Sequence, residues 1–121
     1  MAKSTAFARI RAEVIRLVAL IPAGRFTTYG SIAVHMNCSP RHVAQALSGL
    51  SEEESEALPW HRVVAADARI SRGMDPDLAA RQRSRLEAEG MEIDAKGFIA
   101  NADDHFHTVG FRRDIRWTDP R

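Results

Sequence analysis

Residues 58–64 read Leu-Pro-Trp-His-Arg-Val-Val, and the rest of the chain is best understood around this stretch. Pro59 fixes its own φ angle and holds the preceding residue extended, so the Trp60–His61 step has little conformational freedom. The β-branched pair Val63–Val64 predicts that residues 59–64 form a short buried strand. An indole, an imidazole and a guanidinium therefore follow one another on a stiff segment.

The composition indicates one ordinary globular domain. Of the 121 residues, 45% are hydrophobic and 27% charged, which is enough for a modest core without covalent cross-links. The single cysteine, Cys38, excludes an intramolecular disulfide and fits a reducing compartment. Because no apolar run reaches membrane-spanning length and the first residues do not read as a secretory signal, we expect a cytoplasmic protein with no membrane partner.

The charges are unevenly distributed, although the net charge is only +1. Residues 1–50 carry six basic side chains against one acidic side chain, and residues 51–60 carry four glutamates and no base. The remaining residues balance. A basic amino-terminal half weakly favours a phosphate backbone as the partner, and an ordinary solvated surface explains it equally well.

The amino-terminal residues predict an amphipathic helix. Ser4 or Thr5 can cap this helix, and Pro22 and Gly24 end it. Apolar residues recur on it at three- and four-residue spacing and should face the core. They are Phe7, Ile10, Val14, Leu17 and Leu20.

A helix-turn-helix is predicted next. After a short extended piece, Thr28 is expected to cap a helix over Tyr29–Met36. Ser39 and Pro40 then supply the cap and the first position of a third helix, which reaches to about residue 50. Two short helices joined by a tight turn are typical of a helix-turn-helix.

The second half of the chain predicts one long helix between less regular segments. We expect an acidic loop over residues 51–57 and a turn or hairpin over residues 65–73. Asp75-Pro76 repeats the cap-plus-proline signal and opens a helix that ends at Gly90. Residues 91–100 contain two short extended pieces that predict a small hairpin.

These elements predict a mainly α chain with a small β element, folded as a winged-helix-like helix-turn-helix domain over residues 1–100. No periodicity follows, so residues 101–121 are predicted to form an irregular C-terminal tail. The large apolar residues of this tail are expected to dock on the domain. They are Phe106, Phe111, Ile115 and Trp117.

Five sets of residues, taken in order, carry a family resemblance. They are Ile21-Pro22-Ala23-Gly24; Thr28-Tyr29-Gly30 with Ile32-Ala33; Arg41-His42-Val43 with Ala46-Leu47; Pro59-Trp60-His61-Arg62-Val63; and Glu89-Gly90. Together they resemble the DNA-binding domain of the O6-alkylguanine-DNA alkyltransferases, from about residue 7 to residue 93. The order of the sets makes the resemblance specific, whereas any one set alone would mean little.

One position departs from the alkyltransferase pattern. There, the residue between the proline and the histidine is the cysteine that accepts the alkyl group, and here it is Trp60. The chain therefore resembles the alkyltransferase-like proteins. This implies non-enzymatic recognition of O6-alkylguanine by nucleotide flipping, followed by hand-over of the lesion to nucleotide excision repair proteins such as UvrA. The chemistry agrees, because alkyl displacement needs a thiolate activated by a base, and an indole cannot replace it.

The resemblance also implies a role for individual residues. Tyr29 would press on the 3′ phosphate of the target nucleotide, and Arg41 would fill the space that the flipped base leaves. His61 and Glu89 match the positions of the proton relay and would hold the pocket by hydrogen bonding. A basic residue after the first strand and turn would contact the lesion; Arg72 is the nearest match and Arg69 a weaker one, although Gly73 can also occupy the matching place.

Two sets of site residues follow from these assignments. The predicted lesion pocket consists of Trp60, His61, Val63, Val64, Ala65, Arg72 and Glu89. The predicted DNA contacts are Thr28, Tyr29, Arg41, His42, Ala44, Gln45 and Arg62. The expected partner is double-stranded DNA carrying O6-alkylguanine, bound through its minor groove by a monomer that associates with the nucleoid.

Other interpretations remain open. Cys38 could accept the alkyl group in an active alkyltransferase, or residues 28–50 could form a plain helix-turn-helix regulator. Arg62 is as well explained by structural hydrogen bonding as by contact with DNA. His35, Cys38 and His42 invite a metal site, but a fourth ligand is missing and their spacing spans a turn, so we expect neither metal nor cofactor.

Overall fold

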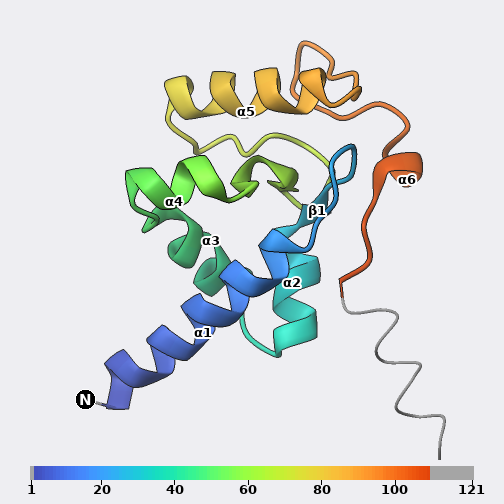
Figure 1. The fold of residues 1–121 in the computed structure, drawn as a ribbon. Coiled ribbons are helices and arrows are strands. Elements are labelled where there is room, and N and C mark those ends of the chain that lie inside the picture. The colour runs from blue at the N-terminus through green and yellow to red at the C-terminus, as the bar shows by residue number, and fades with distance from the viewer. Residues whose placement is uncertain (1, 110–121) are drawn as a thin grey trace, which may run out of the picture.

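The computed structural model describes the backbone of residues 2–109 and the side chains of residues 6–109. The described chain is mainly helical with one small sheet, as the sequence predicts (Figure 1). Its elements are α1 Ala2–Ala19, β1 Thr27–Thr28, α2 Tyr29–Met36, α3 Pro40–Ser48, α4 Glu52–Ala57, a 3₁₀ turn at Trp60–Arg62, β2 Val63–Val64, α5 Pro76–Ala88 and α6 Ala102–His105. None of the described helices is long and apolar enough to cross a membrane.

The first core lies where α1, α2 and α3 pack together. α1 and α2 both contact α3, and their buried side chains form one cluster with Val63 of β2. The buried members of this cluster are Val14, Leu17, Val18, Ile21, Ile32, Ala33, Val43, Ala46 and Val63. Two predictions for α1 are wrong. Ser4 and Thr5 lie inside the helix, which already begins at Ala2, and Leu20 is 52% exposed because the buried stripe continues through Val18 and Ile21 instead.

The helix-turn-helix is confirmed, and its caps are the predicted ones. The Thr28 hydroxyl accepts the Ser31 amide at 3.0 Å, and the Ser39 hydroxyl accepts the His42 amide at 3.4 Å. Between the helices Asn37 has a φ of 59°, a left-handed conformation that asparagine tolerates better than most residues. The turn therefore reverses the chain without a glycine.

The prediction of an acidic loop over residues 51–57 is wrong, because α4 occupies most of it. Ser51 and Glu54 form a reciprocal capping box: the Ser51 hydroxyl accepts the Glu54 amide at 3.1 Å, and the Ser51 amide donates to Glu54 Oε1 at 2.8 Å. Arg11 of α1 adds an ion pair to Glu54 at 2.6 Å. Glutamates in a first turn also interact favourably with the helix dipole, so the acidic run stabilises this helix.

The predicted strand over residues 59–64 is wrong in its first half. Trp60 and Arg62 donate their amides locally, to Leu58 O at 2.8 Å and to Pro59 O at 3.0 Å, so these amides are unavailable to a sheet. Only Val63–Val64 forms a strand, paired in parallel with β1 in the register Thr27 to Val63 and Thr28 to Val64. The Trp60 side chain is thus presented by a tight turn beside the sheet.

A second core lies on the other side of the small sheet, under α5. It contains Phe26, Val64, Leu86, Met91 and Ile99. α5 begins after its predicted cap, Asp75, and ends before Gly90, which has a φ of 97°. The small hairpin is confirmed by an antiparallel bridge between Ile93 and Ile99.

The described part of the predicted tail is not irregular throughout. Residues 102–105 form the helical turn α6, and Phe106 then makes a parallel bridge with Phe26. The two rings meet edge to face with centroids 5.7 Å apart, which confirms the expected docking of Phe106. Phe111, Ile115 and Trp117 lie outside the described residues.

Candidate functional site

A cavity of about 550 Å³ lies beside Trp60. One wall comes from the helix-turn-helix, another from α4 and the link that precedes it, and a third from the loop that leads into α5 and the first turn of α5. The lining residues are Tyr29, Ala44, Leu47, Ser48, Leu50, Ser55, Trp60, Ser71, Gly73, Met74, Asp75 and Leu78. The wall is therefore largely apolar, with a few hydroxyl groups and one carboxylate, a composition that suits a flat aromatic ligand.

The Trp60 indole is held from the side of α5. The guanidinium carbon of Arg85 lies over the ring, 5.6 Å from its centroid, within the range of a cation–π contact. The His61 imidazole meets the indole nearly at right angles, with centroids 6.4 Å apart. The indole Nε1 is buried and has no hydrogen-bond partner among the described residues. Trp60 thus contributes an apolar surface rather than a hydrogen bond to this site.

Glu89 ties three segments together behind the Trp60 turn. Its Oε1 accepts the Gly24 amide at 3.0 Å, and its Oε2 pairs with His61 Nε2 at 2.8 Å and with Arg62 Nη2 at 2.6 Å. Burial opposes ionisation of this carboxyl, but the hydrogen bonds from Arg62, Gly24 and His61 outweigh it and lower the pKa of Glu89 to about 2. Glu89 is therefore an anion at neutral pH and acts as an acceptor for all three groups.

His61 is neutral in this arrangement. Burial lowers the pKa of its imidazole, and the hydrogen bond and charge of Glu89 only partly oppose this effect. Because the Glu89 carboxylate can only accept, the hydrogen is assigned to His61 Nε2, which leaves Nδ1 unprotonated and without a partner among the described residues. The site therefore retains a base, but the residue before it, Trp60, has no proton that a base could remove near neutral pH.

Arg62 belongs to this internal network. Its Nη1 donates to Ile21 O at 2.7 Å, while Nε and Nη2 donate to Glu89. Of the two explanations that the sequence leaves open for Arg62, the geometry favours structural hydrogen bonding. Its guanidinium links the end of the α1 segment to the Trp60 turn and to the end of α5.

The outward side of α3 carries most of the predicted DNA contacts. Arg41, His42, Ala44 and Gln45 are all exposed, whereas Val43 and Ala46 face the core. Arg41 forms no salt bridge or side-chain hydrogen bond with the residues that the structure describes, so its charge is available to a partner. Ala44 also lines the Trp60 cavity, which places the cavity next to this helix.

Tyr29 and Thr28 lie at the start of α2 in different settings. Tyr29 lines the Trp60 cavity and also packs against the first core, and burial raises the pKa of its hydroxyl. Thr28 is buried, and its side chain is engaged in capping α2. Tyr29 is therefore the residue of this pair that the structure brings to the cavity.

Several predicted pocket residues lie elsewhere. Val63 and Val64 are fully buried in the two cores, and Ala65 bridges to Arg69. Arg69 donates to Lys96 O at 2.8 Å. Arg72 is exposed and lines a neighbouring hollow, while Gly73 lines the Trp60 cavity.

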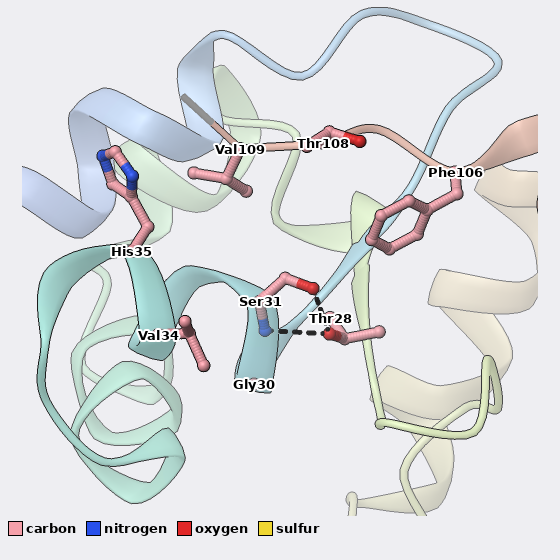
Figure 2. A pocket seen from close by; sticks show the side chains of 8 residues that line it. All are labelled: Thr28, Gly30, Ser31, Val34, His35, Phe106, Thr108 and Val109. Atoms are coloured by element: carbon pink, nitrogen blue, oxygen red, sulfur yellow. Dashed lines mark hydrogen bonds between the residues drawn. The ribbon is translucent and has the colours of Figure 1, made fainter. Parts of the chain in front are cut away.

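A second cavity, of about 510 Å³, lies between α2 and the segment that follows α6. Figure 2 shows its lining and the hydrogen bonds that join Thr28 to Ser31. The lining residues are Thr28, Gly30, Ser31, Val34, His35, Phe106, Thr108 and Val109. It shares no lining residue with the Trp60 cavity, so the two are separate features.

Comparison with known proteins identifies the family. Residues 9–91 match the family described as 6-O-methylguanine DNA methyltransferase, DNA binding domain. The chain belongs to this family. Its alkyltransferase-like branch is indicated by a relative from Schizosaccharomyces pombe, Alkyltransferase-like protein 1, which is 42% identical over 86 residues covering 67% of this chain and 75% of the relative. A DNA base-flipping protein from Vibrio parahaemolyticus is 41% identical over 92 residues, covering 73% of this chain and 86% of the relative.

The fold of this alkyltransferase-like chain agrees with that assignment. It is similar to the crystal structure of S. pombe Atl1 in complex with damaged DNA containing O6-carboxymethylguanine, with a TM-score of 0.71 and 30% sequence identity. The match covers 83% of this chain and 95% of that chain. The family resemblance and the fold class predicted from the sequence are therefore confirmed.

Gln82 is a site residue of this alkyltransferase-like chain that the sequence analysis missed. It is 1% exposed, and its Nε2 donates to His61 O at 3.1 Å and to Val63 O at 2.9 Å, on either side of Arg62. It lies one helical turn before Leu86 on the buried stripe of α5. A polar residue in the apolar stripe of a predicted helix is the signal that could have found it.

Cys38 of this alkyltransferase-like chain lies apart from the Trp60 cavity. The thiol does not line that cavity but packs against the first core, and burial raises its pKa. A raised pKa leaves less of the thiolate that alkyl transfer requires. Among the side chains that the structure describes, those of residues 6–109, no group of three or more His, Cys, Asp or Glu residues could hold a metal ion.

Proposed function

We propose that this chain recognises O6-alkylguanine in duplex DNA and releases it unchanged. The observation that carries the proposal is the place of Trp60. By the family resemblance it stands where the alkyltransferases would have their acceptor cysteine, and it lines a cavity beside the exposed side of α3. The structure of S. pombe Atl1 with DNA containing O6-carboxymethylguanine supports an O6-substituted guanine as the class of ligand.

The geometry suggests how the lesion reaches the cavity. With α3 in the minor groove, Tyr29, which lines the cavity, would press on the target phosphate, and Arg41 would enter the space left in the base stack. Flipping costs a few kcal/mol, and less where damage already weakens pairing. Contacts of the flipped base with Trp60, and burial of its alkyl group at about 0.8 kcal/mol per methylene, offset that cost.

His61, Glu89 and Arg62 would act by holding the Trp60 turn. Their hydrogen bonds connect the turn to Gly24 and to the end of α5, and none of them requires a proton to be transferred. None of the described residues that line the cavity is a cysteine, so a bound alkyl group would meet no thiolate there. The lesion would remain intact for a second protein, and we propose hand-over by a monomer to nucleotide excision repair proteins such as UvrA, in the cytoplasm at the nucleoid.

A paired titration tests the proposal. Two duplexes that differ only by one O6-methyl group are titrated against the protein, followed by Trp fluorescence, and the intact mass of the protein is measured afterwards. We expect tighter binding to the methylated duplex and an unchanged protein mass. Equal affinity for the two duplexes would contradict damage recognition. A gain of one methyl group that disappears in Cys38→Ser would instead establish an active transferase.

A further inference from the structure

The cavity beside Trp60 contains one charged side chain among the described residues that line it, and this residue is an acid. Asp75 carries the charge, whereas the other lining residues are apolar or uncharged. The two basic residues of the preceding loop, Arg69 and Arg72, do not line this cavity. A substituent on a base inside the cavity would therefore share it with a carboxylate.

Asp75 also occupies the place where an anion would otherwise bind. It caps α5, and its Oδ2 accepts the amides of Asp77 at 3.0 Å and Leu78 at 3.3 Å. A helix N-terminus carries about half a positive charge, whereas an ionised aspartate carries a full negative charge. The end of α5 that borders the cavity is therefore net negative, and its capping amides are already engaged.

The charged residues of one hollow that adjoins the Trp60 cavity balance one another. Leu50, Ser55 and Leu78 line both the Trp60 cavity and a neighbouring hollow. The charged residues of that hollow are two acids and two bases, Glu52, Glu56, Arg81 and Arg85. This side of the cavity therefore supplies no net positive charge to oppose Asp75.

Another adjoining hollow is basic, and two of its four bases are engaged. Ser71 lines both the cavity and the hollow that contains Arg69, Arg72 and Arg83 together with Lys96. Arg69 donates to Lys96 O, and Arg83 donates to Ile93 O and Asp94 O. Arg72 and Lys96 are the exposed cations of this set. Arg72 lies between Ser71 and Gly73, which both line the cavity, so it is the cation that an experiment must separate from Asp75.

We propose that Asp75 makes this cavity selective for uncharged O6 substituents and against those that end in a carboxylate. The proposal rests on the proposed function, because it concerns the substituent of the base that the cavity receives. Asp75 is exposed, so solvent weakens the repulsion, but two like charges that share one cavity still repel each other. The apolar wall favours an alkyl substituent at the same time, because it removes apolar surface from water.

Three duplexes test this selectivity in the full chain. They are identical except for one guanine, which is unmodified, O6-carbamoylmethylated or O6-carboxymethylated. The two substituents have the same number of heavy atoms and differ in charge. We expect the carbamoylmethyl duplex to bind more tightly than the unmodified one, and the carboxymethyl duplex to bind about five- to tenfold more weakly than the carbamoylmethyl duplex.

Two variants assign the difference to Asp75. Asp75→Asn keeps an N-cap of the same shape but removes the charge, so the difference should shrink to less than about twofold. Asp77→Asn removes the next acid of the same helix, which is exposed and does not line the cavity, and should leave the difference unchanged.

The other outcomes would overturn either the role of Asp75 or the proposed function. Equal binding of the two modified duplexes, or a difference that persists in Asp75→Asn, overturns the proposal. Tighter binding of the carboxymethyl duplex that is lost in Arg72→Gln also overturns it and makes Arg72 the selective residue. If neither modified duplex binds more tightly than the unmodified one, then the proposed function fails instead.

Discussion

Arg62 and Glu89 form a two-pronged ion pair: Nε and Nη2 of the guanidinium both donate to the carboxylate, at 3.0 Å and 2.6 Å. Both side chains are 16% exposed, so little solvent screens the pair. Removing one charge from such a pair leaves the other buried without compensation, which costs more than the pair itself contributes. The Trp60 turn should therefore depend on Glu89 for its position.

Glu89→Gln should lower the free energy of unfolding by about 3 kcal/mol, because Arg62 would lose its counter-ion. Urea denaturation followed by circular dichroism measures the change. Glu87→Gln is the matched control, because Glu87 is exposed and its side chain makes only a 3.5 Å ion pair with Arg83. This substitution should lower the free energy of unfolding by no more than about 0.5 kcal/mol. Equal losses in the two variants would contradict the role of Glu89.

The stability of the parent chain should fall between about pH 4.5 and pH 2. Burial raises the pKa of Glu89, but its hydrogen bonds outweigh burial and place it at about 2, below the ordinary value of 4.5. A carboxyl group whose pKa is lowered by folding contributes its full stabilisation at pH values above its pKa in the unfolded chain. This contribution is lost as the pH falls through its pKa in the folded protein. In Glu89→Gln the unfolding free energy should depend less steeply on pH in this window; an unchanged slope would contradict the assignment.

Gln82→Met should destabilise the protein by about 2–3 kcal/mol, because the carbonyl groups of His61 and Val63 would lose their donor. Methionine fills a similar volume, so the effect reports hydrogen bonding rather than a cavity. Ser84→Met, on the exposed side of the same helix, provides the control. If the midpoint temperature of thermal unfolding falls equally in both variants, then Gln82 does not anchor the Trp60 turn.

Arg85→Gln should weaken binding of the methylated duplex by about 0.5–1 kcal/mol, through loss of the cation–π contact that orients Trp60. Arg81→Gln controls for the loss of a positive charge on α5. The emission of Trp60, measured with Trp117→Phe as background, should change only in the Arg85 variant. An unchanged spectrum together with unchanged affinity would exclude this orienting role.

Arg41→Ala should weaken binding of the methylated duplex by about 1–3 kcal/mol if the side chain fills the gap in the base stack. Affinity is measured with the same paired duplexes. Arg81→Ala serves as control, because it removes an exposed arginine that lies on α5 instead of α3. Similar losses in both variants would reduce Arg41 to a general electrostatic contact.

The fold was predictable wherever a cap or a periodic stripe is local in sequence. Thr28, Ser39 and Asp75 each mark the start of a helix, and each accepts the expected amide in the structure. α4 was missed although Ser51 and Glu54 have the spacing of a capping box, because its six residues contain no apolar stripe. A short helix that depends on its cap cannot be recognised by periodicity.

The site was predictable in part, because its centre is a local motif and its walls are not. Trp60 and Tyr29 belong to short runs that the sequence shows directly, and both line the cavity. Met74 and Leu78 reach the same cavity from a different element, and nothing in their own neighbourhood marks them. Their contribution depends on how α5 packs on the Trp60 turn, which is a tertiary contact.

The parallel pairing of β1 with β2 has a consequence for how far a nucleotide must move to reach the cavity. β1 leads directly into Tyr29, and β2 follows directly from the turn that carries Trp60, with no flexible linker on either side. The pairing of Thr27 with Val63 and of Thr28 with Val64 therefore fixes the distance between Tyr29 and the Trp60 turn. A nucleotide extracted from DNA would have to travel a set length, so an insertion within residues 27–29 or 60–64 should be far less tolerable than one in a surface loop.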